Sequence, residues 1–253
     1  MTDGLDGRIG LVTGAASGIG RATALVLAGR GASVVIADID ETGAAETAAL
    51  IGDELRTVVV RADVTNETDV ARIVGTAFAR FGRLDCACNV AGISVEPKPF
   101  VEHTRAEWQR VIDVDLTGVF LCMQHELRQM LAQEGGGAIV NVSSGAGVVP
   151  APGQPHYTAA KHAVLGLTKQ AAQEYAGVGI RVNAVLPGQT ETEPMKAYLD
   201  AQPDHGERLL RRMPMGRMAR PDEIAESIAW LCSDASSYVN GVSLLVDGGQ
   251  IAR

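Results

Sequence analysis

Short apolar runs alternate with longer amphipathic segments along almost the whole chain. Seven runs predict strands, at residues 8–12, 34–37, 57–61, 84–89, 138–142, 179–186 and 242–246. Helical patterns lie between nearly all of them, at residues 21–29, 41–51, 67–81, 105–133, 155–175 and 221–232. This alternation predicts an α/β fold with a doubly wound, seven-stranded parallel sheet and helices on both faces.

No linker, repeat or low-complexity stretch divides the pattern, so we expect one domain over residues 1–253. Residues 193–218 depart from the alternation because they are polar and bounded by prolines. We expect residues from about 190 to 215 to form a loop that covers a substrate pocket. Its apolar side chains, which suit a pocket for a ring or chain, are Met195, Tyr198, Leu199 and Met213. Its charged side chains, which suit a solvated lid equally well, are Glu193, Lys196, Arg208, Arg211 and Arg212.

Glycine, proline or a polar residue follows the carboxyl end of six predicted strands. These residues are Gly14, Asp38, Asp63, Asn89, Ser144 and Pro187. Because parallel strands end on the same edge of their sheet, residues far apart in sequence converge there. A ligand site is therefore expected at this edge, where the strand order reverses.

The first predicted strand leads into a glycine-rich turn, TGAASGIG at residues 13–20, and then into a helix. Glycines let a ligand approach the backbone closely, and a helix N-terminus presents free N–H groups to phosphate oxygens. Asp38 follows about 20 positions later at a strand end, where a carboxylate suits the hydroxyls of an adenosine ribose. The alternative role for Asp38 is a helix N-cap.

Tyr157 and Lys161 are one helical turn apart in a helix that begins at Pro155. A lysine cation at this distance stabilises a phenolate, which fits the tyrosine for general acid/base chemistry. Ser144 follows a strand end and can hydrogen-bond a substrate oxygen beside the tyrosine. Next to Tyr157, His156 either contacts substrate or faces water at the start of the helix.

Composition excludes several classes of function. The 22 Lys and Arg against 30 Asp and Glu give a formal charge of −8, which disfavours nucleic-acid and anionic-membrane surfaces. Without a basic, apolar leader or an apolar run of about 18 residues, we expect a cytoplasmic protein. The cysteines Cys86, Cys88, Cys122 and Cys232 show no CxxC pair or zinc-like spacing, so no metal site is expected and core positions are favoured.

Together these features resemble the classical short-chain dehydrogenases/reductases over nearly the whole chain. The matching motifs are the turn at 13–20, Asp38, Asp63-Val64, Asn89-Val-Ala-Gly92, Ser144, Tyr157-x-x-x-Lys161, Pro187-Gly188 with Thr192, and Val246-Asp-Gly-Gly249. The resemblance implies a Rossmann-type fold and an NAD-dependent oxidoreductase that interconverts a secondary alcohol and a ketone. It also implies a homotetramer.

The resemblance assigns expected roles to individual positions. Gly14, Ser17, Gly18, Ile19 and Gly20 would hold the pyrophosphate and adenosine side, Asp38 the ribose diol, and Asp63 and Val64 the adenine. Asn89, Ala91 and Gly92 would line the cofactor cleft, and Pro187, Gly188, Thr190 and Thr192 would meet the nicotinamide end. Ser144 would orient the substrate oxygen, Tyr157 would move the proton, and Lys161 would bind the nicotinamide ribose.

The chain departs from the family pattern at two positions. Val90 replaces the second Asn of Asn-Asn-Ala-Gly, but the first Asn is retained as Asn89. Asp115, in the sequence VDLTG, stands where the family has Asn, a position that helps to hold a water chain leading to the lysine. Either Asp115 is compatible with a working site, which we favour, or its charge disables the proton relay.

Two functions remain open at the level of sequence. The first is an NAD-dependent alcohol oxidation in which the Tyr157 phenolate accepts the hydroxyl proton. The second is a non-catalytic NAD-binding sensor or scaffold, against which the intact Ser144, Tyr157 and Lys161 argue. The substrate is a small molecule, but sugars, steroids, cyclic alcohols and 3-hydroxyacyl compounds are all compatible with the sequence.

Overall fold

The computed structural model describes residues 4–201 and 213–252 and contains a seven-stranded sheet in which every neighbouring pair is parallel. The strand order is β3-β2-β1-β4-β5-β6-β7. The strands are β1 (Ile9–Thr13), β2 (Ser33–Asp38), β3 (Thr57–Arg61), β4 (Cys86–Asn89), β5 (Gly137–Val142), β6 (Ile180–Pro187) and β7 (Ser243–Val246). All seven predicted strands are therefore confirmed, as is the doubly wound, Rossmann-type fold.

The strand order reverses between β1 and β4, because the chain runs outward from β1 in one direction and then returns to its other side. Thr13 and Asn89 are register partners at this point, so β1 and β4 end side by side. The turns that follow them must diverge to opposite faces of the sheet. A crevice at the carboxyl ends of these two strands is the geometric consequence.

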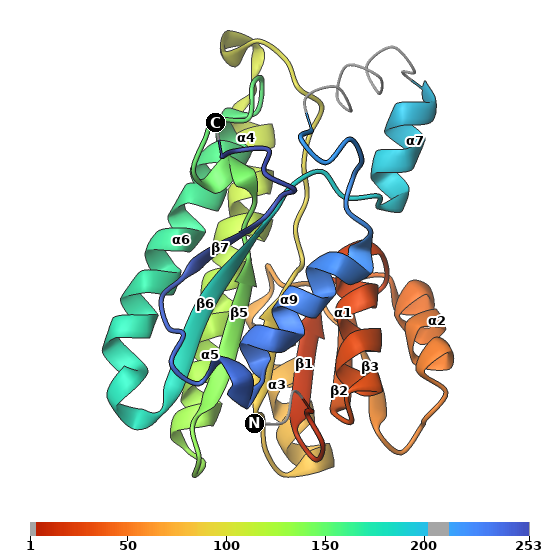
Figure 1. Ribbon diagram of the computed structural model, residues 1–253, viewed down its shortest axis with the longest axis vertical. Helices are drawn as coiled ribbons and strands as arrows, with labels where there is room; N and C mark the ends of the chain where they lie inside the picture. The colour runs from red at the N-terminus through yellow and green to blue at the C-terminus, as the bar shows by residue number, and fades with distance from the viewer. Residues whose placement is uncertain (1–3, 202–212, 253) are drawn as a thin grey trace.

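Helices cover both faces of the sheet. Two core clusters show that α1 (Gly18–Gly29), α2 (Glu41–Ile51) and α9 (Pro221–Cys232) pack on one face, and α3 (Glu67–Phe81), α5 (Val119–Leu131) and α6 (Pro155–Tyr175) on the other. Figure 1 shows α9 lying beside α1 on the same face of the sheet. None of the helices in the described part of the chain has the length and hydrophobicity that a membrane crossing requires.

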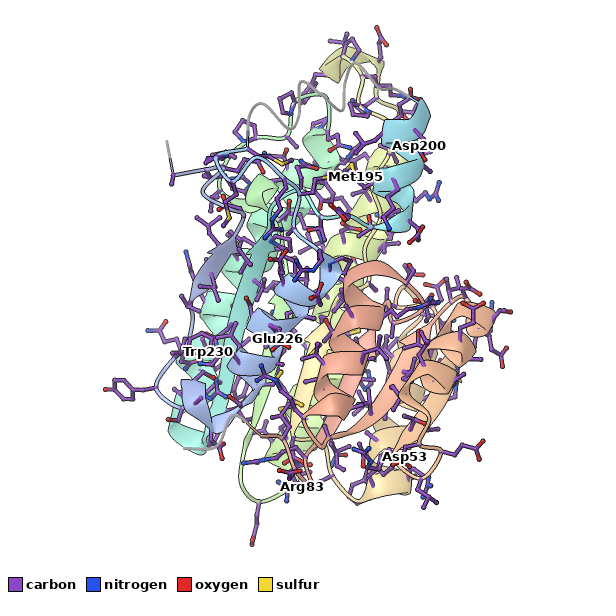
Figure 2. The ribbon with its side chains drawn as sticks, turned by 45° about the vertical axis from the view of Figure 1, so that its right-hand side comes forward. Asp53, Arg83, Met195, Asp200, Glu226 and Trp230 are labelled. Atoms are coloured by element: carbon purple, nitrogen blue, oxygen red, sulfur yellow. The ribbon has the colours of Figure 1, made fainter. Side chains whose placement is uncertain are left out.

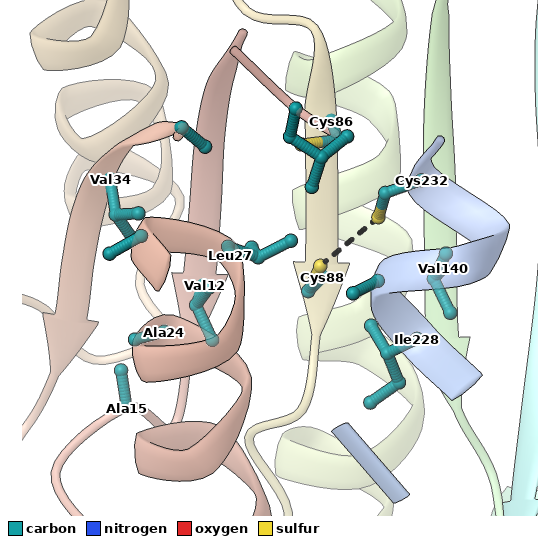
Figure 3. Close-up of a cluster of buried hydrophobic side chains, with 14 of the residues drawn as sticks. Val12, Ala15, Ala24, Leu27, Val34, Cys86, Cys88, Val140, Ile228 and Cys232 are labelled. Carbon is teal, nitrogen blue, oxygen red and sulfur yellow. Dashed lines mark hydrogen bonds between the residues drawn. The ribbon is translucent and has the colours of Figure 1, made fainter. Parts of the chain in front are cut away.

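The cysteines belong to the core, as their spacing predicted. Cys86 and Cys88 both point from β4 toward α1 and α9, where Cys232 of α9 meets them among Leu27 and Ile228 (Figure 3). The sulfur atoms of Cys88 and Cys232 are 3.7 Å apart, which is a contact between thiols and not a disulfide bond. All four thiols are buried and pack as small apolar groups.

The predicted helix at 105–133 is interrupted. It consists of α4 (Arg105–Ile112), a π-helical segment (Asp113–Gly118) and α5. The wider π turn carries Asp115 into the interior, where the side chain is fully buried. Gly118 permits this packing, because a Cβ at that position would lie 2.9 Å from Cγ2 of Val64. Periodicity alone does not reveal the π turn, because the turn only displaces the apolar positions locally within a pattern that stays helical.

The predicted loop at about 190–215 is also partly helical, because α7 covers Glu193–Ala201. Figure 2 shows Met195 and Asp200 of α7 at the end of the molecule opposite Asp53 and Arg83. The expected pocket-covering residues Arg208, Arg211 and Arg212 lie outside the described residues. Short 3-10 segments at Phe100–Glu102, Gly145–Gly147, Ala176–Val178 and Asp234–Ser236 complete the described elements.

Replacing Gly118 by Ala should lower the free energy of unfolding by about 1–3 kcal/mol, because the added methyl group overpacks the contact with Val64. Gly75→Ala is the matched control. Gly75 is an exposed position in α3 where a Cβ would meet nothing within 4 Å, so this change should stabilise by about 0.5–1 kcal/mol. Urea denaturation measures both variants, and equal effects of the two substitutions would contradict the packing argument.

Candidate active site

A continuous cleft of about 1730 Å³ opens at the carboxyl ends of the strands. It is lined by all but one of the residues to which the family resemblance assigns a place in the site. The lining includes Gly14, Ser17, Gly18, Ile19, Gly20, Asp38, Asp63, Val64, Ala91, Gly92, Asp115, Ser144, Tyr157, Lys161, Pro187, Gly188, Thr190 and Thr192. The tertiary structure thus brings the predicted phosphate turn and the predicted acid/base residues to one surface. The exception, Asn89, lies directly below it.

The glycine-rich turn between β1 and α1 has little room for side chains. Gly14 has φ +68°, and a Cβ there would approach the backbone of Ala91 to 2.8 Å. At Gly20 a Cβ would lie 1.9 Å from the carbonyl oxygen of Gly14. Ser17 is the N-cap residue of α1, but its side chain makes no capping hydrogen bond. The N-terminus of α1 can therefore offer its backbone N–H groups to an anionic ligand in the cleft.

Asp38 ends β2 at the edge of the cleft, and it is not the N-cap of α2. That role belongs to Asp40, whose side chain accepts a hydrogen bond from the N–H of Gly43. The Asp38 carboxylate instead accepts from the N–H of Ala16 and from the N–H of Asp40, each at 2.9 Å. The helix-cap alternative for Asp38 is therefore wrong. Each carboxylate oxygen has one backbone donor and keeps acceptor capacity for a ribose hydroxyl.

Ser144, in the segment after β5, and Tyr157 and Lys161, on α6, all line the cleft. Pro155 is at the start of α6, as predicted, so Tyr157 and Lys161 lie on one face of the helix. The Lys161 ammonium group is 5.4 Å from the centroid of the Tyr157 ring. Ser144 is held in extended conformation, and its hydroxyl accepts from the N–H of Ala146 at 3.1 Å. The hydroxyl proton of Ser144 consequently remains available to the cleft.

Lys161 is anchored by the protein on two sides. Its Nζ donates to the carbonyl of Val142 at 3.2 Å and lies 3.2 Å from Oδ2 of Asp115. The backbone of Lys161 is held as well, because Ser143 Oγ donates to the carbonyl of Lys161 at 2.8 Å. The other oxygen of Asp115 accepts from the N–H of Ile93 at 2.7 Å. Asp115 therefore links the lysine to the turn that follows β4.

Burial and charge oppose each other in this pair. Burial raises the pKa of the Asp115 carboxyl above its ordinary value, against the opposing effect of the Lys161 cation. Burial also disfavours the charge on Lys161, but Asp115 and Tyr157 together more than offset this, so the pKa of Lys161 is raised. The two groups face each other at 3.2 Å in a buried salt bridge. At the position where the resemblance expects Asn, Asp115 is thus in direct contact with Lys161.

Comparison with known proteins agrees with this geometry. A family model described as enoyl-(acyl carrier protein) reductase matches residues 14–250. The cis-4-hydroxycyclohexanecarboxylate dehydrogenase of Sinomonas cyclohexanicum is 51% identical over 246 residues, which are 97% of each chain. The chain belongs to the short-chain dehydrogenase/reductase family. It is thus an oxidoreductase of a family that uses nicotinamide cofactors on alcohols and ketones.

Two further short-chain dehydrogenase/reductase relatives match over nearly their full length. The cyclohexanol dehydrogenase of Acinetobacter sp. strain SE19 is 39% identical over 258 residues, covering 100% of this chain and 98% of the relative. A solved structure from Agrobacterium tumefaciens with bound NADP superposes with a TM-score of 0.89 at 36% identity, over 99% of both chains. The family therefore includes close structural relatives that bind the phosphorylated cofactor.

The cleft is also lined by residues that, apart from Met195, sequence patterning did not single out. They include Val95, Val149, Gln154, Met195 and Ile251. They come from two loops, from α7 and from the carboxyl-terminal turn. No motif identifies such residues, because their proximity depends only on how the loops fold over the sheet edge.

His156 differs from both of its expected environments. Its side chain is fully buried and does not line the cleft. The ring packs edge-on against His103 with centroids 4.7 Å apart, and His103 Nε2 lies 2.8 Å from the carbonyl of Gly153. Since an aromatic partner from residues 97–104 covers the helix start, the prediction that His156 faces water is wrong. Its Nδ1 accepts from the N–H of Tyr157 at 2.7 Å.

Asp115→Asn should lower the free energy of unfolding at neutral pH by about 3 kcal/mol, because it leaves the Lys161 cation buried without its counter-ion. Asp113→Asn makes the same isosteric change two residues away in the π segment, at a partly exposed carboxylate, and should change stability by less than about 1 kcal/mol. Chemical denaturation measures both.

Turnover distinguishes the two roles considered for Asp115. If the site works with Asp115, Asp115→Asn should show no large gain in turnover when its pH–rate profile is measured beside that of the wild type. A gain of about a hundredfold or more at the pH optimum, nearly 3 kcal/mol in activation free energy, would show that Asp115 disables the site.

Proposed function

We propose that this protein is an NAD(H)-dependent short-chain dehydrogenase/reductase that interconverts a secondary alcohol and a ketone with Tyr157 as acid/base. The observation that carries the proposal is the convergence of Ser144, Tyr157 and Lys161 on the cleft that also contains the glycine-rich turn and Asp38. An acid/base group next to a dinucleotide-sized cleft is the arrangement that a hydride-transfer enzyme requires.

The residues divide the work as follows. A bound nicotinamide cofactor would supply the hydride acceptor in oxidation and the hydride donor in reduction. In oxidation, the Tyr157 phenolate accepts the proton of the substrate hydroxyl, and Ser144 donates a hydrogen bond to the same substrate oxygen. The Lys161 cation, held by Asp115 and Val142, stabilises the negative charge on Tyr157 through space. In reduction, Tyr157 returns the proton to the forming alcohol.

Asp38 supports NAD as the preferred cofactor. Its carboxylate lies at the cleft and can accept from both hydroxyls of an adenosine ribose, whereas it would repel a 2′-phosphate. The next residue is Ile39, and Ser17 is uncharged, so neither neighbouring position provides a cation for a phosphate. A structural relative has NADP bound, so the shared fold does not exclude a 2′-phosphate. The proposed preference for NAD therefore rests on the local charge at Asp38.

Cyclic secondary alcohols are the proposed substrate class. The names of two relatives, cis-4-hydroxycyclohexanecarboxylate dehydrogenase and cyclohexanol dehydrogenase, support it. Val95, Val149, Met195 and Ile251 offer apolar surface at the substrate end, which suits a saturated ring. α7, which carries Met195, is the described part of the segment that we propose covers this pocket.

A homotetramer formed by one-domain subunits is the proposed assembly. Phe120 and Leu131 of α5 and Leu245 of β7 are at least 42% exposed, which fits helix-to-helix and strand-to-strand contacts between subunits. Light scattering should give the mass of four chains, 26.5 kDa each. A stable monomer at micromolar concentration would contradict this assembly.

A non-catalytic NAD sensor or scaffold is the second function considered. It would bind the cofactor but leave the reduced-nicotinamide absorbance unchanged across a panel of secondary alcohols. The intact set of Ser144, Tyr157 and Lys161 at the cleft argues against it, because cofactor binding alone requires no proton-transferring tyrosine.

Tyr157→Phe should lower turnover by about 100- to 10,000-fold, because it removes the proton-transferring group and retains the ring. NADH binding, followed by fluorescence, should change little, since the glycine-rich turn and Asp38 are untouched. Tyr175→Phe at the other end of α6 is the matched control and should retain activity. Near-native turnover of Tyr157→Phe would show that another group moves the proton.

The catalytic efficiency with NAD should exceed that with NADP by at least tenfold, or about 1.4 kcal/mol. Asp38→Asn removes the charge that repels a 2′-phosphate and should reduce this preference. Glu54→Gln makes the same change of charge at an exposed position outside the cleft and should leave the preference unchanged. Equal efficiencies of the wild type with the two cofactors would overturn the NAD assignment.

A further inference from the structure

A carboxyl group with no role in the proposed reaction lies below the cleft. Glu126 of α5 is fully buried, and its Oε2 accepts a hydrogen bond from Nδ2 of Asn89 at 3.0 Å. Asn89 is the last residue of β4 and is itself only 2% exposed. Sequence patterning did not single out Glu126, because one acidic residue in a long helix resembles a solvated position.

Asn89 and Glu126 belong to a buried chain of hydrogen bonds. Nδ2 of Asn89 also donates to Oδ1 of Asn141 at 3.0 Å, and Nδ2 of Asn141 donates to Oγ1 of Thr168 at 2.9 Å. The hydroxyl of Thr168 in turn donates to the carbonyl of Val164 at 2.8 Å. The two amides and the hydroxyl therefore all donate within the chain, and it ends on the backbone of α6.

Two acceptors in this chain remain without a hydrogen-bond partner, namely Oδ1 of Asn89 and Oε1 of Glu126. Oε1 is the second oxygen of the Glu126 carboxyl group, and Oδ1 is the one oxygen of the Asn89 amide. These two planar groups already share the hydrogen bond from Nδ2 to Oε2. A proton on Oε1 would supply a donor for Oδ1, so that acid and amide pair through both of their ends. One proton would thereby satisfy both orphaned atoms.

The surroundings favour the neutral acid. The titratable groups that face Glu126 are Cys122 on its own helix and Cys88 on β4, while β5 and α6 contribute only the uncharged Asn141 and Thr168. Burial raises the pKa of Cys122, and the pKa of Cys88 is also raised, although its contact with Cys232 opposes burial. Burial raises the pKa of Glu126 to about 8, against the hydrogen bond from Asn89.

We propose that Glu126 is a positioning residue that, as a neutral carboxylic acid, pairs with both ends of the Asn89 amide and so holds the turn after β4. This turn borders the cleft. The N–H groups of Val90 and Ala91 donate to Oγ1 of Thr13 at 3.1 and 3.3 Å, and Ala91 packs against Gly14 of the glycine-rich turn. That this turn borders a cofactor site rests on the proposed function. The proton on Glu126 and its hold on the turn after β4 do not, because they are properties of the fold.

The pH dependence of stability follows from the direction in which the pKa of Glu126 is shifted, which is upward. Since the folded state holds the Glu126 proton more tightly than the unfolded chain does, the stabilisation from this group is complete below its ordinary pKa. It decreases as the pH rises and is lost above about 8. The Glu126→Gln variant should lack this dependence, because an amide offers one donor and one acceptor at every pH.

Infrared spectroscopy tests the proton directly. At pH 7 the wild type should show the carbonyl stretch of a protonated carboxyl group, which should disappear as the pH is raised past about 8. The band should be absent from Glu126→Gln and retained in Glu67→Gln, a control at an exposed carboxylate. A wild type without the band at pH 7, or a band that persists in Glu126→Gln, would overturn the proposal.

Hydrogen exchange tests the positioning. After correction for the intrinsic effect of pH, the amides of Val90 and Ala91 should exchange at least tenfold faster at pH 9 than at pH 7 in the wild type. Glu126→Gln should show no such acceleration. Equal acceleration in the two proteins would overturn the positioning role. Because neither measurement uses substrate or cofactor, failure of the proposed function would not be confused with failure of this inference.

Discussion

The reversal of strand order between β1 and β4 is the constraint on which the site depends. It makes two adjacent strands end side by side while their following turns move to opposite faces, and the space between the turns becomes the cleft. The backbones of the two turns then approach so closely that Gly14 cannot carry a side chain beside Ala91. A polar ligand can consequently reach backbone N–H groups without displacing side chains.

Buried polar groups at the cleft wall fix its chemistry against a mostly apolar interior. Lys161 is compensated by Asp115 and by a strand carbonyl, and Asp115 ties the same lysine to the turn after β4. Burying a charge is unfavourable unless it is paired, so the ion pair leaves the lysine few alternative positions. The π segment makes this possible, because it brings a helical aspartate to the lysine of a neighbouring helix.

Sequence reasoning found the parts of the site that motifs encode and missed the parts that packing assembles. Gly14, Asp38, Ser144, Tyr157 and Lys161 follow strand ends or keep a fixed helical spacing, so their convergence could be foreseen. His156 was placed wrongly because its partner, His103, lies some fifty residues away in a connecting segment. The helix at 193–201 was read as a loop, since proline and charged residues obscured its short pattern.

The amino-acid sequence by itself determined the order of strands and helices, because alternating apolar runs and amphipathic segments can bury their surfaces in few other ways. It also determined which residues reach the carboxyl edge of the sheet. Only the tertiary structure decided the state of the buried polar groups. Asp115 beside Lys161 and Glu126 beside Asn89 are both acidic residues in helical sequence. A local motif marks the position of Asp115 but not its direct contact with Lys161, and nothing local marks Glu126. Their protonation depends on partners from other elements and on the exclusion of water, which exist only in the folded chain.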